Sequence, residues 1–362
     1  MNKKLLSSSA LVGAMLISGA ALAEFKVSGD ITATYVMGSD DTGSTGTNGK
    51  ASGETIGNEF NIIMSGSSDL NNGMKAKYSG KLEFDGVSTS EPDHEYELKL
   101  ESANGFYVAF ANDGGQSNRT SMTPFVSYPI GSVGFAVAGA TASTSSGGGF
   151  AGDSFISGVH QSNNIGFGGK IGGGDFVLRY APNTAKVNGN DITTTGGGVT
   201  ADATGATGSG YMMAYNGKFD ALGLNASYTV EQKDDTNIAT EGEAKEKRIG
   251  FNYTMGAVKV GADYIKYTDG STAKSTDRTT TIVGLAYAAD KNTTVGAYMQ
   301  TTEADIAAGG LQDEDMKMLT LGYNLGAGSV ALSIVDVQGF GNAATSTGAD
   351  YQGLVLATKV GF

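Results

Sequence analysis

Apolar and polar residues alternate along most of the chain. Near the start of the alternating region, Phe25, Val27 and Ile31 share one phase, whereas Lys26 and Asp30 share the other. Successive side chains of a β-strand point to opposite faces, so a period of two predicts a strand with one apolar and one polar face. A helix would mix these two sets of residues on its surface.

The same alternation recurs from one end of the chain to the other. Most of the alternating segments run about 9–14 residues, enough for a tilted strand to cross a bilayer. Beyond residue 23, no apolar run approaches the roughly 20 residues that a membrane-spanning helix needs. If the chain meets a membrane, it must therefore do so as a closed barrel, because only helices and closed barrels satisfy their backbone groups in lipid. Further segments with this pattern lie at residues 60–66, 74–85, 95–101, 248–255 and 354–362.

The links between these segments alternate between short and long. Short links of turn-forming residues occur at 71–73, 103–105, 129–131, 172–174, 220–223, 256–257, 290–292 and 326–328. Longer polar links lie near residues 38–55, 86–93, 112–123, 141–158, 183–208, 234–244, 269–277, 303–314 and 339–349. This alternation is typical of outer-membrane barrels, whereas a Greek-key sandwich gives no reason for it. The sequence predicts an all-β, up-and-down antiparallel transmembrane β-barrel.

The number of strands follows from the links. Eight short and nine long links give 18 strands. Sixteen is equally acceptable if one marginal hairpin, around Phe125 to Phe135, does not span the membrane.

Residues 1–23 are expected to be a signal peptide that is removed. Lys3 and Lys4 precede an apolar stretch at residues 10–22, and Ala21-Leu22-Ala23 is a small-residue cleavage signature. A single barrel domain is then expected over residues 24–362, exported to the cell outer membrane.

Charge and composition exclude several classes of protein. The chain has 24 basic and 37 acidic residues, a formal net charge of −13 and no cysteine. Nucleic-acid binding is not expected, because phosphates need clusters of Lys and Arg. Disulfides cannot contribute to stability. The overall acidity favours a mild preference for cations in any pore.

The polar phase supplies the candidate functional residues. In a barrel of 16–18 strands this phase lines a water-filled channel, where rings of charge set the ion preference. A basic stripe (Lys75, Lys77, Lys81) and an acidic stripe (Glu95, Glu97, Glu101) could set a field across the lumen, or could be neutralising pairs on neighbouring strands. The pore-lining candidates are Lys26, Asp30, Lys75, Lys77, Lys81, Glu83, Glu97, Lys99, Arg179, Arg248, Lys259 and Asp263.

No cofactor is expected, and no metal site is assigned. Acidic loop clusters could bind divalent cations that bridge outer-leaflet lipids, or could simply be solvated loops. They are Asp40-Asp41, Asp234-Asp235 and Asp313-Glu314-Asp315. Tyr and Phe near strand ends would form the interfacial girdles. They are Phe60, Phe84, Tyr96, Tyr180, Tyr215, Tyr253, Tyr298, Tyr323 and Phe362.

An enzyme is not expected. The only histidines are His94 and His160, and the chain contains no G-x-S-x-G, H-E-x-x-H or cysteine nucleophile. Two alternatives stay open beside a general pore: an acidic, exported, adhesin-like β protein without a pore, and a substrate-specific outer-membrane channel.

Both ends of the expected mature chain resemble one family. The first strand (residues 24–30, EFKVSGD), the MSGSSD run at 64–69 with its Asn72-Gly73 turn, and the last strand ending at Phe362 look like Gram-negative general porins of the alphaproteobacterial type. The likeness covers the whole mature chain as architecture, but as residue-level similarity only these short stretches.

The resemblance implies a homotrimer of 16-stranded barrels that pass small hydrophilic solutes and ions. It implies partners in the outer-membrane lipids, including lipopolysaccharide, and in the assembly machinery, which would read the Phe362 strand. It also implies closure of the barrel by the terminal strands, with the Glu24 amine near the Phe362 carboxylate.

One loop departs from the family pattern. In the family the third long loop folds into the barrel and narrows it. Here that loop is expected at residues 112–123, with Asp113 and Arg119 as constriction candidates and without the acidic run of many relatives. Either the pore is wider, or the link at 141–158 or at 183–208 narrows it.

Overall fold

The fold is described from a computed structural model of the chain. The described residues are 24–40, 53–70, 73–85, 93–112, 159, 163–182, 209–233, 242–268, 277–304, 314–340 and 349–362. The expected signal peptide at 1–23 lies outside them, and its removal stays a prediction. Among these residues, no helix is both long and apolar enough to span a bilayer.

The described chain forms sixteen strands. The first eight are β1 (Glu24–Asp40), β2 (Gly53–Asp69), β3 (Lys75–Asp85), β4 (Asp93–Glu101), β5 (Tyr107–Asn112), β6 (Asn164–Ile171), β7 (Gly174–Ala181) and β8 (Gly210–Phe219). The second eight are β9 (Leu222–Lys233), β10 (Gly242–Met255), β11 (Val258–Thr268), β12 (Arg278–Ala288), β13 (Thr293–Ala304), β14 (Glu314–Asn324), β15 (Gly328–Phe340) and β16 (Ala349–Gly361).

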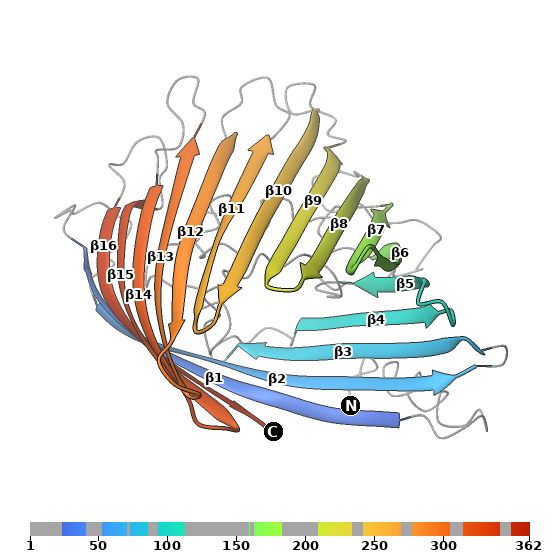
Figure 1. Ribbon diagram of the computed structural model, residues 1–362, viewed down its shortest axis with the longest axis horizontal. Coiled ribbons are helices and arrows are strands. Elements are labelled where there is room, and N and C mark those ends of the chain that lie inside the picture. The colour runs from blue at the N-terminus through green and yellow to red at the C-terminus, as the bar shows by residue number, and fades with distance from the viewer. Residues whose placement is uncertain are drawn as a thin grey trace, which may run out of the picture.

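The strands make one closed antiparallel barrel. Each strand pairs with its neighbours in the sequence, and β1 pairs with β16 to complete the ring. Figure 1 shows this continuous wall, with the first and last strands side by side. The predicted all-β, up-and-down barrel is confirmed.

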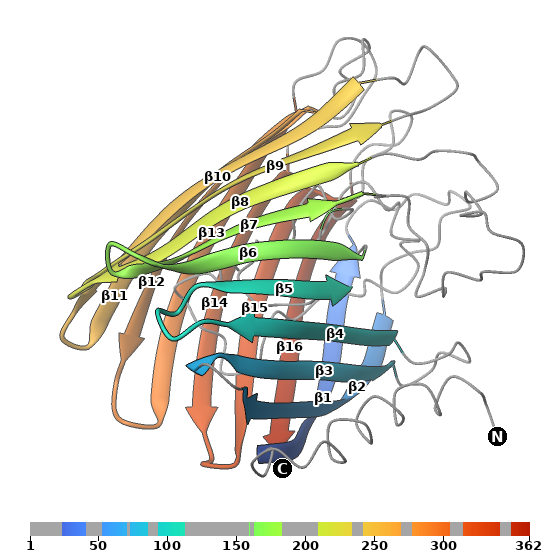
Figure 2. The same ribbon diagram turned by 90° about the vertical axis from the view of Figure 1, so that its right-hand side faces the viewer.

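The links divide between the two ends of the barrel. Within the described strands, every second link joins its two strands in two to five residues, and these tight turns lie together at one end (Figure 2). Seven of the eight predicted short links fall at these turns. In one of them, Asp290 accepts hydrogen bonds from the backbone N–H groups of Asn292 (2.7 Å) and Thr293 (2.8 Å), which hold the pKa of Asp290 below its ordinary value.

The alternative count of 18 strands is wrong, and the count of 16 is confirmed. Strand β5 pairs directly with β6, so no strand from the connection at residues 113–163 lies between them. The segment around Phe125 to Phe135 alternates like a hairpin, and its short link at 129–131 falls outside the described residues. Local alternation cannot distinguish such a segment from a wall strand, because pairing partners are not visible in a single sequence.

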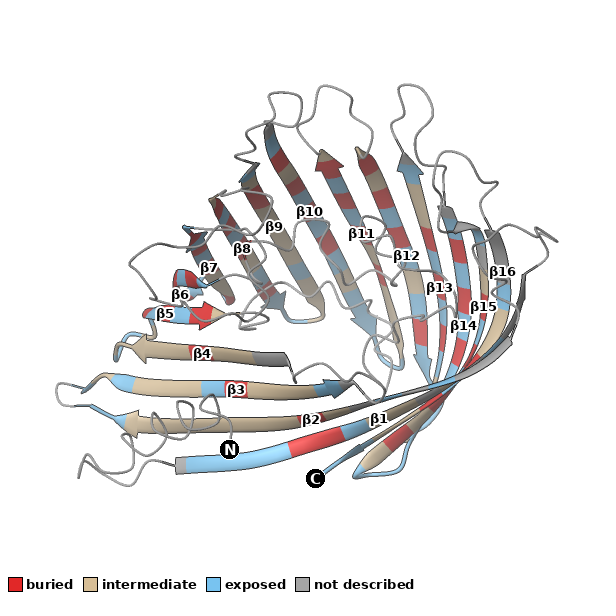
Figure 3. Cartoon of the chain, turned by 180° about the vertical axis from the view of Figure 1, so that it is seen from behind, coloured by how far each residue is buried: buried red, intermediate tan, exposed pale blue. Residues whose placement is uncertain are grey.

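Burial alternates along the strands as the period of two requires. On β11, Asp263 and Ile265 are buried, whereas Tyr264 between them is exposed. Figure 3 shows this banding on many strands. The exposed phase carries the large apolar side chains, as expected of an outer face in contact with lipid. Tyr298, one of the girdle candidates, lies instead in the inner phase of β13, where it is buried and donates a hydrogen bond to Gln300 (3.1 Å).

The seam of the barrel joins the two ends of the described wall. Phe362 and Gly29 exchange two backbone hydrogen bonds of 3.0 Å each. The Phe362 ring also stacks on Phe60, with 5.9 Å between ring centroids. Phe362 pairs with Gly29, whereas Glu24 lies five residues before Gly29 on β1 and pairs with Ser67. The expectation that the Glu24 amine lies at the Phe362 carboxylate is therefore wrong. Five strand residues span about 17 Å.

We predict that Gly29→Ala destabilises the barrel. A Cβ at Gly29 would overlap the Asn61 carbonyl oxygen and the Phe362 ring, so the seam must shift, at a cost of about 1–3 kcal/mol. The measurement is the urea midpoint of the refolded protein. Gly166→Ala is the control, because its Cβ would meet only ordinary contacts, at 3.5 Å or more. Equal midpoints for the two variants would contradict this account of the seam.

Candidate functional site

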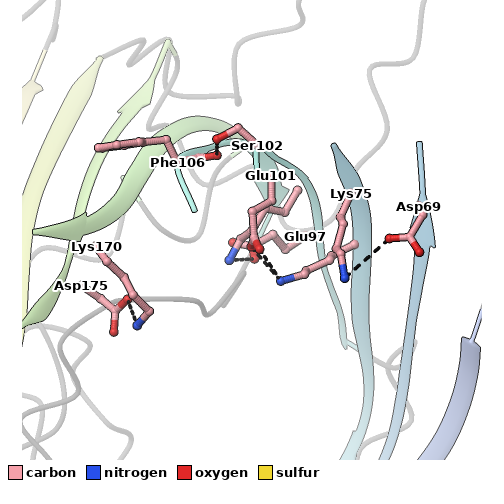
Figure 4. Close-up of polar contacts among 10 residues, drawn as sticks. Asp69, Lys75, Glu97, Glu101, Ser102, Phe106, Lys170 and Asp175 are labelled. Carbon is pink, nitrogen blue, oxygen red and sulfur yellow. Dashed lines mark hydrogen bonds and ion pairs between the residues drawn. The ribbon is translucent and has the colours of Figure 1, made fainter. Parts of the chain in front are cut away.

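The inner wall of the barrel carries most of the predicted site residues, beginning with the two charged stripes. The register places Lys75 opposite Glu101 and Lys81 opposite Glu95 on the neighbouring strands β3 and β4. Lys77 Nζ lies 2.7 Å from a Glu101 carboxylate oxygen, and Lys81 Nζ lies 3.5 Å from Glu95 and also pairs with Glu83. Figure 4 shows Lys75 reaching Asp69, and Glu97 and Glu101 close together on β4. The stripes therefore lie side by side, and their contacts are those of neutralising neighbours.

A buried polar network crosses the wall from β4 to β7. The Arg179 guanidinium donates to a Glu97 carboxylate oxygen (2.9 Å) and to the Asn164 side-chain carbonyl (2.7 Å). Glu97 also pairs with Lys99 (3.2 Å), whose ammonium lies 4.2 Å from the centroid of the Tyr107 ring. All these residues share the inner face.

Small residues on β5 and β6 leave room for the Arg179 side chain of β7 to extend to Glu97 on β4. Ala109 on β5 and Gly166 on β6 are register partners, and a Cβ at Gly166 would lie 3.5 Å from Cγ of Arg179. The long Arg179 side chain therefore passes over a part of the wall that has little side-chain bulk of its own. Arg and carboxylate geometry suits a charge-assisted pair of this kind.

Part of the connection between β5 and β6 lies inside the barrel. Val159, from the connection at residues 113–163, is fully buried in a cluster with Val177, Ala181, Met212 and Ala214. These four partners share the inner face of β7 and β8. Because β5 ends at Asn112 and pairs directly with β6, which begins at Asn164, the third long link spans residues 113–163, and the expectation of a dozen-residue third loop is wrong. Its constriction candidates Asp113 and Arg119 lie outside the described residues, so they are not placed.

Two more groups of charges lie farther around the inner wall. On β10, Arg248 Nε donates to Glu246 (2.8 Å), and both side chains are buried. Asp263, opposite Gly250, is also buried.

Beside the seam, Asp30 accepts from Asn61 Nδ2 (3.1 Å) and pairs with Lys359 (3.2 Å). Lys259 is half-buried on the inner face of β11.

Several inner-wall residues were missed from the sequence. Glu246 could have been found from its spacing, since residues i and i+2 of a strand share a face. Asn164 and Arg278, whose guanidinium carbon lies 5.9 Å from the Tyr267 ring centroid, sit at strand ends where the alternation is too short to fix a phase. Lys359 pairs across the seam, which cannot be seen before the ends are joined.

Exposure divides the charged wall into a closed and an open part. The Arg179 side chain is 2% exposed, whereas Lys77 is 43% exposed. The open part forms a hollow of about 390 Å³ on β1 to β4, lined by Lys26, Ser65, Ser67, Lys77, Glu97 and Lys99 among others. Hydroxyl, ammonium and carboxylate groups together can solvate small polar solutes and ions.

The described residues offer no cluster of His, Cys, Asp or Glu that could hold a metal ion. Of the acidic loop clusters, Asp41, Asp234, Asp235 and Asp313 lie outside the described residues. Asp315 accepts a hydrogen bond from the Thr301 hydroxyl (2.7 Å).

We predict that Arg179→Met destabilises the barrel, because the buried Glu97 carboxylate loses its guanidinium partner and keeps the ion pair with Lys99. Removing one partner of a buried pair costs about 3–5 kcal/mol when the remaining charge has no other partner, so the loss should approach this range from below. Lys170→Met is the control, because Lys170 pairs with Asp175 while 79% exposed, and exposed pairs contribute about 0–1 kcal/mol. Urea unfolding of both variants is the measurement, and a smaller loss for Arg179→Met than for Lys170→Met would refute the buried network.

Comparison with known proteins places this wall in a family. The profile of the Gram-negative porins matches residues 7–334. No curated protein sequence matches the chain.

Solved structures of engineered variants of the Rhodopseudomonas blastica porin share the fold. One has a TM-score of 0.58 at 18% identity, another 0.58 at 17%, and a third 0.56 at 18%. Each alignment covers 94% of this chain and 100% of the other. Because the family profile spans most of the sequence and the barrel has the porin fold, the chain belongs to the Gram-negative porin family.

Proposed function

We propose that this outer-membrane porin lets small hydrophilic solutes and ions diffuse passively through a water-filled pore. The observation that carries the proposal is the closed 16-stranded barrel with an apolar exposed face and an inner wall of charged and hydroxyl groups. Barrels of 16–18 strands leave an aqueous channel, whereas barrels of about eight strands are filled by their own side chains.

The open hollow on β1 to β4 is the proposed path for solutes along the wall. Its lysines Lys77 and Lys99 are held by neighbouring carboxylates, so they present fixed charges to passing ions. The buried pairs at Arg179 and Arg248 would instead maintain the shape of the wall. The twelve pore-lining candidates therefore divide into wall groups open to solutes and wall groups that brace the barrel.

The connection between β5 and β6 is proposed to narrow the pore. Val159 anchors it against β7 and β8, three strands along the wall from the end of the charged hollow on β1 to β4. A narrowing between these two parts of the wall would bring permeating ions close to the lysines of the hollow.

The acidity of the whole chain supports a mild preference for cations, although the hollow itself has three lysines and one glutamate. Acidic groups elsewhere would have to outweigh these lysines. We therefore expect removal of a lysine from the hollow to strengthen the preference for cations.

A trimer, removal of residues 1–23 and recognition of the Phe362 strand during assembly are proposed from the resemblance to general porins. The position of Phe362 in the seam supports the last of these. A terminal residue that closes the ring is a suitable signal that the whole chain is present.

The family and the closed barrel argue against an adhesin without a pore. A substrate-specific channel would differ from a general one in saturation. Conductance that falls on addition of one solute class, at concentrations where others have no effect, would favour specificity.

The experiment is single-channel recording of the refolded mature protein in a planar bilayer. Large stable steps are expected, closing in threes if the protein is trimeric. A folded, inserted protein that never conducts would contradict the proposed function.

We predict that Lys77→Gln shifts the reversal potential under a salt gradient by several millivolts in the direction of cation selectivity, because it leaves Glu101 without its partner. Lys317→Gln is the control, because Lys317 is exposed on the outer face of β14, in phase with Leu319. The same shift in both variants, or none in Lys77→Gln, would exclude Lys77 from the conduction path.

A further inference from the structure

The outer face carries an unexpected group of basic residues on β10 and β11. Lys245 and Lys247 share their phase with the exposed Ile249 of β10, and Lys266 shares its phase with the exposed Tyr264 of β11. These three lysines therefore point away from the pore, on the surface that otherwise carries large apolar side chains. We call them the outer lysine cluster.

The cluster lies at the edge of the apolar belt nearest the long loops. Strand β10 begins at Gly242 after a long link, and β11 ends at Thr268 before another. The apolar residues of these strands lie on the other side of the cluster, towards the tight turn at Gly256. A lysine at this level can extend its apolar stem along the belt and place its ammonium among lipid headgroups.

The arrangement is electrostatically unfavourable without a counter-charge. Lys247 is directly opposite Lys266 in the register of the two strands. Like charges directly opposite each other on one face of a sheet destabilise it. Among the described residues, Glu243 is the only carboxylate in an ion pair with the cluster, and it pairs with Lys245 (2.8 Å).

Aromatic side chains pack around the cluster. The Lys247 ammonium lies 5.9 Å from the Tyr228 ring centroid, and Tyr228 packs edge-on against Tyr211 at 6.2 Å. Val230, whose register partners are Tyr211 and Lys245, is only 1% exposed although it belongs to the outer face. The side chains around Val230 thus form a packed surface.

We propose that the outer lysine cluster is a docking surface for the phosphate groups of a phosphorylated outer-leaflet lipid. Neighbouring strands are about 4.8 Å apart, so Lys247 and Lys266 can donate to different oxygens of one phosphate. Clusters of basic residues at the level of lipid headgroups attract anionic lipids. The charge is local, since the chain as a whole has a formal net charge of −13.

This inference goes beyond solute passage and does not require the pore to conduct. It requires only that the barrel sits in the membrane with its apolar face against lipid. A conduction failure and a lipid-binding failure are therefore separate results.

Lys317 on β14 provides a matched control. It is also an exposed, outward-facing lysine three residues from the start of its strand, but its register partner on β15 is Asp336. Lys317 thus has a residue of opposite charge as its register partner, where Lys247 has a lysine, so neutralising Lys317 should not affect binding of an anionic lipid.

The test is native mass spectrometry of the refolded, detergent-solubilised protein titrated with diphosphorylated lipid A. The double variant Lys247→Gln with Lys266→Gln should bind at least about tenfold more weakly than the wild type, since each charge-assisted contact contributes roughly this factor. Lys317→Gln should bind as the wild type does. Heat-modifiable migration on a gel checks that every variant is folded.

Two further arms identify the source of the phosphate. Dephosphorylated lipid A should bind the wild type no better than the double variant. Inorganic phosphate at millimolar concentration should not displace the lipid, because the acyl chains add their own contact with the belt.

Equal binding by the wild type and the double variant, or an equal loss in Lys317→Gln, would overturn the proposal. Displacement by inorganic phosphate would also overturn it, in favour of a free-anion site. If the double variant changed the oligomeric state while binding lipid normally, the cluster would be a contact between protomers instead.

Discussion

Closure of the sheet is the constraint on which the rest of this structure depends. In hydrocarbon no water is available to satisfy backbone N–H and C=O groups, so an open sheet edge cannot stand in a bilayer. The pairing of β1 with β16 removes both edges, and the Phe362 and Gly29 backbones complete it. Gly29 is required at this point because any side chain would occupy the space of the Phe362 ring. The two faces follow from closure, since alternation along a closed wall necessarily gives one face to lipid and one to the lumen.

The inner wall shows how charge can be both structural and available to solutes. Around Arg179 the charges are buried and fully engaged, so they can only brace the wall, and with Val159 they form a closed side of the lumen. On β3 and β4 similar residue types remain partly exposed, because Lys77 and Lys81 pair with neighbours that are themselves open to water. The two groups of ion pairs differ in exposure because of the residues that cover each pair, and not because of the residue types in the pairs.

The sequence was sufficient for the barrel because period-two alternation and link length are local properties. It was insufficient where the answer depends on pairing between distant segments. The stretch around Phe125 to Phe135 has the alternation of a strand, yet β5 pairs with β6 without it. On β12 to β15 both phases contain apolar residues, for instance the buried Ile282 and Met316 and the exposed Val283, so polarity alone could not assign Tyr298 to its face. The sequence also could not show which charged residues pair with each other, because Glu97 and Arg179 are three strands apart.

The central claim, that one phase of the wall faces water and the other faces lipid, is tested most directly by thiol labelling. The chain has no cysteine, so single cysteines can be introduced without background. The account predicts that Ser67→Cys and Ser79→Cys, in the hollow, react with a charged, membrane-impermeant thiol reagent and lose conductance on modification. Ala76→Cys and Leu82→Cys, in the other phase of β3, should react only with a lipid-soluble reagent. Equal reactivity of the two sets, or the reverse pattern, would contradict the account.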